Sequence, residues 1–160
     1  MFNVLPLRDW RGYEGKILRI NQDGSIPDDN PVLNGVRSHV FSYGHRNPQG
    51  MAFGPDGALY SAEHGQDTDD EVNRIVAAGN YGWPLIAGFK DDQYYTYANW
   101  SQSSPIPCEE LPYGGEVPDT VPRIRESEVE LPDFVPPLQT FFTVPSTHDA
   151  RASGNATAAL

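Results

Sequence analysis

Short runs of alternating apolar and polar residues recur along the chain and predict β-strands. In residues 49–54, Met51 and Phe53 fall on one face by the two-residue period of a strand. The other segments predicted as strands are residues 15–21, 38–43, 58–63, 71–76 and 138–144. Strands this short and this closely spaced favour an antiparallel meander, as in a propeller blade or a barrel.

Turn residues separate these predicted strands. Asp23-Gly24 provides the positive φ of a tight reversal, and Pro55-Asp56-Gly57 turns the chain between two strands. Residues 25–35 carry two prolines and four Asp or Asn residues, and we expect a loop there. Residues 79–84 form an aromatic turn bracketed by glycines.

The second half of the chain is organised differently. Prolines recur between residues 93 and 138 too often for a helix interior or a central strand, which predicts long surface connections. Residues 147–160 are rich in Ala, Ser, Thr and Asn and are expected to be a disordered tail. We therefore expect one domain over residues 1–146, followed by that tail.

Composition narrows the classes of partner. The chain has 160 residues and a net charge of -11, which disfavours nucleic acid and anionic membranes and favours cations such as calcium. No window approaches the roughly 20 apolar residues of a membrane helix, so membrane insertion is not expected. The first residues do not form a secretory signal peptide, and the single Cys108 allows no intrachain disulfide.

Arg46 and Asn47 lie directly before a proline, which favours an extended backbone at Asn47. A guanidinium beside an amide suits recognition of a carbonyl or a carboxylate group. The alternative is that Arg46 pairs with a nearby acid and that Asn47 caps a turn.

Residues 67–71 hold four carboxylates in five positions, which repel one another unless a cation or an arginine neutralises them. The run departs from the EF-hand pattern, because Val72 stands where that loop requires glycine. A metal site and a solvated acidic loop are the two interpretations.

Other chemical groups have ordinary alternatives. His45 and His64 are either ligands or acid-base groups, or merely hydrogen-bonded histidines, and no zinc-site spacing is present. No glycine pattern for phosphate and no nucleophile elbow is found. The aromatic residues between 94 and 100 either stack on a sugar or a flat cofactor, or pack a loop against the sheet.

Taken together, these motifs closely resemble the soluble glucose and sorbosone dehydrogenase family. Members of this family are quinoproteins that carry pyrroloquinoline quinone (PQQ) and calcium in a six-bladed β-propeller. The resemblance covers about residues 10–146. It is carried by residues 15–27, 30–31, 44–50, 63–65, 70–73, 80–84, 87–92, 126–128 and 134–138.

The resemblance implies roles for residues near the cofactor. Arg46 would face the quinone oxygen that gains charge and would therefore be catalytic, and Asn47, His64 and Asp70 would also bind the cofactor. The backbone carbonyls of Gly65 and Gln66 would hold the calcium ion of the cofactor. Glucose-oxidising members of the family carry proline at the position of Gln66 and glutamine at the position of His64, whereas the wider sugar dehydrogenases carry histidine at the latter. A carbonyl ligand does not depend on its side chain, so the difference at Gln66 weakens that site only through the rigidity of the loop.

A second calcium site is implied as well. Its ligands would be Glu71, the carbonyl of Tyr81, Asp91 and Glu126, which together form an oxygen cage suited to calcium.

The implied function is PQQ-dependent oxidation of an aldose sugar, with hydride passing from the anomeric carbon to the quinone and then to an external electron acceptor. A homodimer and a periplasmic or secreted location are compatible with the family. The family's general-base histidine and its later substrate-binding residues have no counterpart in this chain. We therefore expect two to three propeller blades of all-β structure and no efficient dehydrogenase activity from the chain alone. The alternative is a calcium-stabilised β-sheet binding module or a non-catalytic truncated product.

Overall fold

The computed structural model describes residues 12–110 and 117–148. This part of the chain contains short strands and three single-turn 3-10 helices and no α-helix, which confirms the expected all-β class. The strands are β1 (Lys16–Leu18), β2 (Val32–Leu33), β3 (Val36–Arg37), β4 (Val40–Tyr43), β5 (Pro48–Phe53), β6 (Leu59–Glu63), β7 (Asp70–Ile75), β8 (Tyr97–Ala98), β9 (Arg123–Ile124) and β10 (Gln139–Phe141). The 3-10 helices are η1 (Trp100–Gln102), η2 (Cys108–Glu110) and η3 (Glu126–Glu128).

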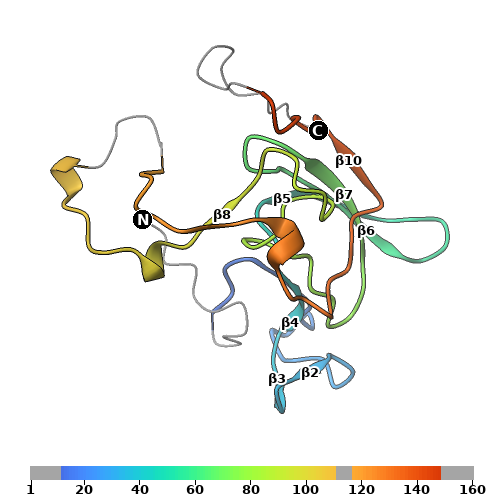
Figure 1. The fold of residues 1–160 in the computed structure, drawn as a ribbon. Coiled ribbons are helices and arrows are strands. Elements are labelled where there is room, and N and C mark those ends of the chain that lie inside the picture. The colour runs from blue at the N-terminus through green and yellow to red at the C-terminus, as the bar shows by residue number, and fades with distance from the viewer. Residues whose placement is uncertain (1–11, 111–116, 149–160) are drawn as a thin grey trace.

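A four-stranded antiparallel sheet is the largest element of the fold, with the strand order β10-β7-β6-β5 (Figure 1). Strands β5, β6 and β7 follow one another as a meander. The turn from β5 to β6 is closed by a hydrogen bond of 2.9 Å from the Gly57 amide to the Gly54 carbonyl. Strand β10 arrives from the far end of the described chain and pairs with β7, which completes the sheet.

The register of β6 and β7 determines which side chains share a face. Leu59 pairs with Ile75, Ser61 with Asn73, and Glu63 with Glu71. Paired residues in an antiparallel ladder point to the same side. One face of the sheet therefore changes from apolar at one end, through two polar residues, to a pair of carboxylates at the other end.

All six predicted strands are found, as β1, β4, β5, β6, β7 and β10. The loop expected over residues 25–35 differs, because its end forms β2 and the turn of a β2-β3 hairpin. Asn34 and Gly35 form the turn, with φ values of 49° and 76°. Two consecutive positive φ values are typical of an Asn-Gly hairpin turn, and two-residue strands are too short to show alternation.

The hydrophobic core is small and lies between the β1-β4 pair and the four-stranded sheet. Its main cluster contains Ile17, Ile75 and Tyr81, against which Phe41, Leu59 and Val135 pack. A second cluster is formed by Val40 and Tyr43 with Leu33 packed against it.

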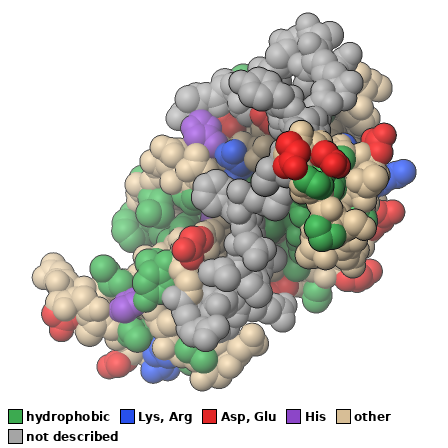
Figure 2. Space-filling view, turned by 90° about the vertical axis from the view of Figure 1, so that its left-hand side faces the viewer, with side chains coloured by type: hydrophobic (Ala, Val, Ile, Leu, Met, Phe, Trp, Pro, Cys, Tyr) green, Lys and Arg blue, Asp and Glu red, His purple; other side chains and the backbone are tan. Residues whose placement is uncertain are grey.

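Strand β5 lies at the edge of the sheet and is only partly covered. Met51 pairs with Ser61 and Phe53 with Leu59, so both lie on one face, as expected. However, Met51 is 58% exposed and Phe53 77% exposed. The space-filling view likewise shows hydrophobic side chains open to the surface on one side of the molecule (Figure 2).

Asn80 connects distant parts of the chain. Parallel bridges join it to Tyr43 on one side and to Phe134 on the other. Its carbonyl accepts a hydrogen bond of 2.7 Å from the Val135 amide. This contact brings the segment around residue 134 beside the end of β4.

Two further expectations are a disordered tail over residues 147–160 and the absence of a membrane-spanning helix. Residues 149–160, which make up nearly all of the expected tail, lie outside the described residues. Among the residues that are described, no helix has the length and apolar character needed to cross a membrane.

Candidate functional site

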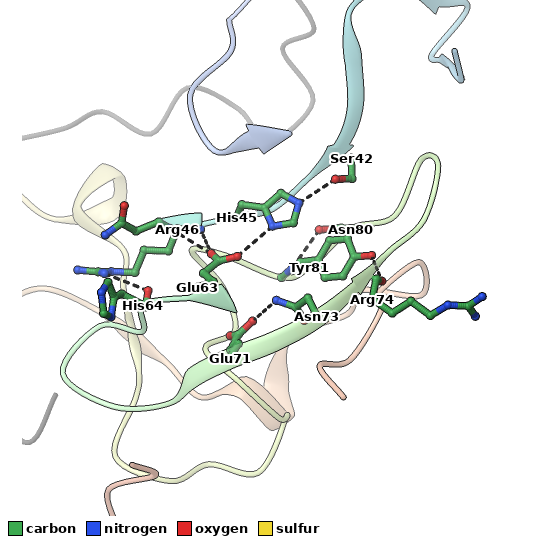
Figure 3. A network of polar contacts seen from close by, with 12 residues as sticks. Ser42, His45, Arg46, Glu63, His64, Glu71, Asn73, Arg74, Asn80 and Tyr81 are labelled. Carbon is green, nitrogen blue, oxygen red and sulfur yellow. Dashed lines mark hydrogen bonds and ion pairs between the residues drawn. The ribbon is translucent and has the colours of Figure 1, made fainter. Parts of the chain in front are cut away.

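The site is built around the buried carboxylate of Glu63, at the end of β6 (Figure 3). Its Oε1 accepts hydrogen bonds from the backbone amides of Arg46 and Asn47, the second at 3.1 Å. Its Oε2 lies 3.0 Å from Nδ1 of His45. Only 4% of Glu63 is exposed, so one carboxylate holds three successive residues of the segment before β5.

His45 is fixed on several sides. Its Nε2 lies 2.9 Å from the Ser42 hydroxyl, and its ring stacks on Tyr81 with centroids 4.6 Å apart. Both His45 and Ser42 are buried. The structure therefore agrees with the interpretation of His45 as a hydrogen-bonded histidine of the interior.

Arg46 extends from this buried base to a half-buried position. Its Nη1 donates to the His64 carbonyl at 3.0 Å and its Nε to the Gln66 side chain at 3.3 Å, and the guanidinium lies 5.6 Å from the centre of the Trp83 ring. Within residues 12–110 and 117–148, no carboxylate forms an ion pair with it, and its Nη2 donates to no side chain or carbonyl. The alternative in which Arg46 is neutralised by a nearby acid is therefore not supported.

Asn47 is held mainly through its backbone. Its amide donates to Glu63, and its carbonyl accepts from the His64 amide at 3.2 Å. Its side-chain oxygen accepts from Gln49 at 2.8 Å. The half-buried Asn47 side chain thus lies beside Arg46 at the same end of the sheet.

The connection from β6 to β7 is tightly folded. The Gly65 amide donates to Asp70 Oδ1 at 3.0 Å, and Asp70 Oδ2 lies 3.3 Å from Nδ1 of His64. A Cβ atom on Gly65 would lie 1.7 Å from the Thr68 carbonyl oxygen, so only glycine fits there. The carbonyls of Gly65 and Gln66 accept no hydrogen bond from another described residue; Gly65 is buried and Gln66 is exposed.

The acidic run is largely buried. Asp69, Asp70 and Glu71 are 2%, 1% and 7% exposed. Asp69 accepts hydrogen bonds of 2.6 Å from both Thr68 and Thr143, and burial raises the pKa of its carboxyl group. A solvated acidic loop is therefore not what the structure contains.

Glu71 and Glu126 both bind the segment around residues 87–92. Glu71 accepts from the Gly88 amide at 2.7 Å and from Asn73 at 2.9 Å. Glu126 accepts hydrogen bonds from the Ala87 amide at 2.9 Å, the Asp92 amide at 3.1 Å and the Asp91 amide at 3.4 Å. Neither carboxylate forms an ion pair with a Lys or Arg among the described residues.

Burial raises the pKa values of these two glutamates. The pKa of Glu71 rises to about 8, mainly through burial and then through the charge of Glu63, its partner across the strands. Burial raises the pKa of Glu126 to about 7. A divalent cation would favour the ionised form of both.

The remaining two residues of the implied second calcium site lie in different settings. Tyr81 is buried and donates its hydroxyl to the Arg74 carbonyl at 2.6 Å. Asp91 is exposed, and one of its oxygens accepts from the Gln93 amide at 3.0 Å. In the described part of the chain, no three His, Cys, Asp or Glu side chains lie close enough together to hold one metal ion. The donor atoms suit calcium, and the ligand set stays a prediction.

The aromatic residues between 94 and 100 favour the packing interpretation where contacts are present. The Tyr95 ring lies 5.6 Å from that of Trp83, and its hydroxyl donates to the Pro84 carbonyl at 2.6 Å. Tyr94 contacts His148 edge-on. These contacts hold the loop after residue 84 against the rest of the fold.

Sequence reasoning missed Glu63 and Ser42 as partners of His45. The available signal was the position of Glu63 at a strand end next to His64, in a segment otherwise rich in site residues. Which way its carboxylate points depends on the strand register, which the sequence does not display.

Known proteins are similar to this chain over most of its length. The Glucose / Sorbosone dehydrogenase family matches residues 7–106, more than half of the chain. Quinoprotein glucose dehydrogenase B of Acinetobacter calcoaceticus is 51% identical over 143 residues, which are 89% of this chain and 30% of that protein. Aldose sugar dehydrogenase YliI of Escherichia coli is 49% identical over 92 residues, 52% of this chain and 25% of that protein.

A solved structure shows the same relationship in three dimensions. An oxidoreductase (glucose dehydrogenase) from Thermus thermophilus matches with a TM-score of 0.55 and 32% identity, covering 87% of this chain and 33% of that one. The chain thus spans between a quarter and a third of the length of these relatives. The expected partial β-propeller is confirmed, and the chain belongs to the glucose/sorbosone dehydrogenase family.

Proposed function

We propose that this chain forms one wall of a PQQ site in the oxidation of aldose sugars. The observation that carries this proposal is the Arg46 guanidinium, which is anchored through Nη1 and Nε, lies over Trp83, and has no carboxylate partner among the described residues. Because no acid among the described residues neutralises this half-buried cation at the end of a sheet, the guanidinium can bind an electron-rich ligand. Family membership and the quinoprotein relative support the same ligand.

The chemical roles of the residues are proposed from the family resemblance, and their geometry supports them. When bound, the quinone supplies a two-electron acceptor for the hydride of the sugar's anomeric carbon. The unused Nη2 of Arg46 can donate to an oxygen on which negative charge develops, and such a fixed donor favours the transition state. Asn47 lies beside Arg46, and His64 and Asp70, within hydrogen-bond distance of each other, line the neighbouring loop and would complete the cofactor wall.

We extend the proposal to calcium ions at two places. The free carbonyls of Gly65 and Gln66 would hold the ion at the cofactor. The ligands proposed for a second ion are Glu71, the Tyr81 carbonyl, Asp91 and Glu126, whose side chains would have to move together around it. The charge of this ion would offset two buried carboxylates that have no basic partner in the described residues. An aldose substrate, an external electron acceptor, a homodimer and a periplasmic or secreted location complete the proposal by family resemblance.

A second candidate is a calcium-stabilised β-sheet module without catalysis. The buried Glu71 and Glu126 favour this candidate, because neither forms an ion pair with a Lys or Arg among the described residues. A bound cation would stabilise their ionised forms whether or not a quinone binds. In this case the ion would stabilise the loop at residues 87–92 and nothing more.

Calorimetric titration of the purified chain with calcium, and then with PQQ, separates the two candidates. We expect both to bind, and we expect Arg46→Ala to weaken PQQ binding at least 10-fold while calcium binding is kept. Arg37→Ala, a change of an exposed arginine on β3, is the matched control and should leave both affinities unchanged. Calcium binding without any PQQ binding by the native chain would favour the module.

Turnover is a separate question from cofactor binding. With PQQ, calcium, glucose and a dye acceptor, we expect no calcium-dependent turnover from this chain alone. Clear turnover would refute that expectation and would strengthen the dehydrogenase assignment.

A further inference from the structure

We propose that Glu63 is a positioning residue that sets the direction of Arg46 and Asn47 toward the cofactor. This inference rests on the proposed function, because the direction of Arg46 matters only if its guanidinium meets a ligand. Glu63 itself is buried behind the residues it holds, so it acts through them (Figure 3). It is therefore distinct from the residues proposed to touch the quinone.

The first argument is the number of donors on one carboxylate. Oε1 accepts from two successive backbone amides, those of Arg46 and Asn47, and Oε2 accepts from His45 Nδ1. Two successive amides that point at one oxygen restrict the backbone dihedrals between them. This restriction fixes the direction of the Cα–Cβ bond of Arg46. Pro48 in addition limits Asn47, the residue before it, to an extended backbone.

The second argument is that the carboxylate is itself immobile. It comes from β6, the central member of the β5-β6-β7 meander, and its Oε2 is held by a histidine that Ser42 and Tyr81 fix in turn. All four side chains are buried. The chain of contacts thus transfers the rigidity of the sheet to the segment that carries Arg46.

The third argument concerns chemistry. A carboxylate is the side chain that presents two acceptor atoms and no donor, and all three partners here are donors. Glutamine would keep one acceptor for the two backbone amides, and its NH₂ group would then face His45 Nδ1. The imidazole can change its tautomer to accept that hydrogen bond, because the Ser42 hydroxyl can either donate or accept.

Three substitutions at Glu63 separate the length of its side chain, here called its reach, from its charge. Glu63→Gln keeps the reach and loses the charge, Glu63→Asp keeps the charge and loses the reach, and Glu63→Ala loses both. A positioning role predicts that Gln resembles the native residue and that Asp resembles Ala. A purely electrostatic role of the carboxylate predicts the opposite order.

Hydrogen exchange of the Arg46 and Asn47 amides, followed by NMR on the 160-residue chain without cofactor, is the first test. We expect exchange of these two amides to become at least 10-fold faster in Asp and Ala and to stay within about 3-fold of native in Gln. Amides of the β6-β7 ladder report global unfolding, and Glu130→Gln, a change at an exposed residue, is the matched control. If Ala unfolds the chain, the comparison of Asp with Gln decides.

PQQ affinity of the same variants is the second test. We expect a loss of roughly 10-fold to 100-fold in Asp and Ala and a loss below about 3-fold in Gln, because a small displacement of a positioned group has effects of this size. Unchanged amide exchange in Asp and Ala, or loss of PQQ affinity in Gln but not in Asp, would overturn the proposal for Glu63. If the native chain binds no PQQ, the proposed function fails, while the exchange experiment still shows whether Glu63 holds the segment.

Discussion

Two buried serines allow the Ser42–His45 hydrogen bond to be measured against a matched reference. Ser42 on β4 and Ser61 on β6 are 0% and 2% exposed. Changing either to alanine removes the same hydroxyl from a strand interior. The two changes differ in their partners, because the Ser42 hydroxyl lies 2.9 Å from His45, whereas that of Ser61 has no hydrogen-bond partner within the described residues.

The expected magnitudes follow from this difference. Ser42→Ala leaves a buried imidazole nitrogen without a partner, which costs about 1–3 kcal/mol of unfolding free energy. Ser61→Ala removes a hydroxyl that is already unsatisfied, so we expect it to be neutral or to stabilise by up to about 1 kcal/mol. Burial and size are nearly the same for both, although β4 belongs to a two-stranded pair and β6 is an inner strand of the four-stranded sheet, so the difference between the variants reports mainly the hydrogen bond.

Urea unfolding of both variants, followed by circular dichroism, measures the difference. At equal m-values, the midpoint of Ser42→Ala should fall and that of Ser61→Ala should stay or rise. Equal destabilisation by the two changes would refute the reasoning, because it would mean that the Ser61 hydroxyl also has a partner, such as a bound water molecule.

Three further predictions concern the carboxylates and the β6-β7 loop. In metal-free buffer, the native state keeps protons on Glu126 (pKa about 7) and Glu71 (pKa about 8), whereas an unfolded glutamate with its ordinary pKa of 4.5 releases them. The unfolding free energy should therefore fall as pH rises from about 5 to 8. Urea titrations should show that Glu126→Gln flattens this slope by up to about 1.4 kcal/mol per pH unit below pH 7. Calcium added at pH 8 should raise the melting temperature more than at pH 5, and a smaller increase in Glu71→Gln would identify that ligand, whereas an equal increase would exclude it. Gly65→Ala should destabilise the chain by more than about 2 kcal/mol in the same urea assay, because its Cβ would overlap the Thr68 carbonyl, while Gly24→Ala, which has open space, should cost only about 1 kcal/mol for its positive φ.

The strands could be predicted from the sequence because the two-residue period of side chains along a strand appears in the order of apolar and polar residues. Alternation around Met51 and Phe53 located β5, and Pro55-Asp56-Gly57 located the turn after it. The β2-β3 hairpin was missed because two-residue strands carry too little pattern. Its Asn34-Gly35 pair was the signal that could have revealed it.

The site was less predictable, because its state depends on contacts between distant segments. The acidic run is buried since Thr143 and the loop around Gly88 cover it, and both come from later in the chain. A local sequence window contains neither. The role of Glu63 likewise depends on a register that places its carboxylate against residues 45–47.

The paired rows of β6 and β7 also have a consequence for folding accuracy. Leu59 and Ile75 belong to the core, while Glu63 and Glu71 on the same face belong to the proposed site. A slip of one strand by a single residue would move its whole row of side chains to the opposite face. The same error would remove Leu59 or Ile75 from the core face and would release residues 45–47 from their anchor. A misregistered molecule would therefore be both unstable and unable to bind, so the fraction of chains able to bind ligand should measure the fraction correctly folded.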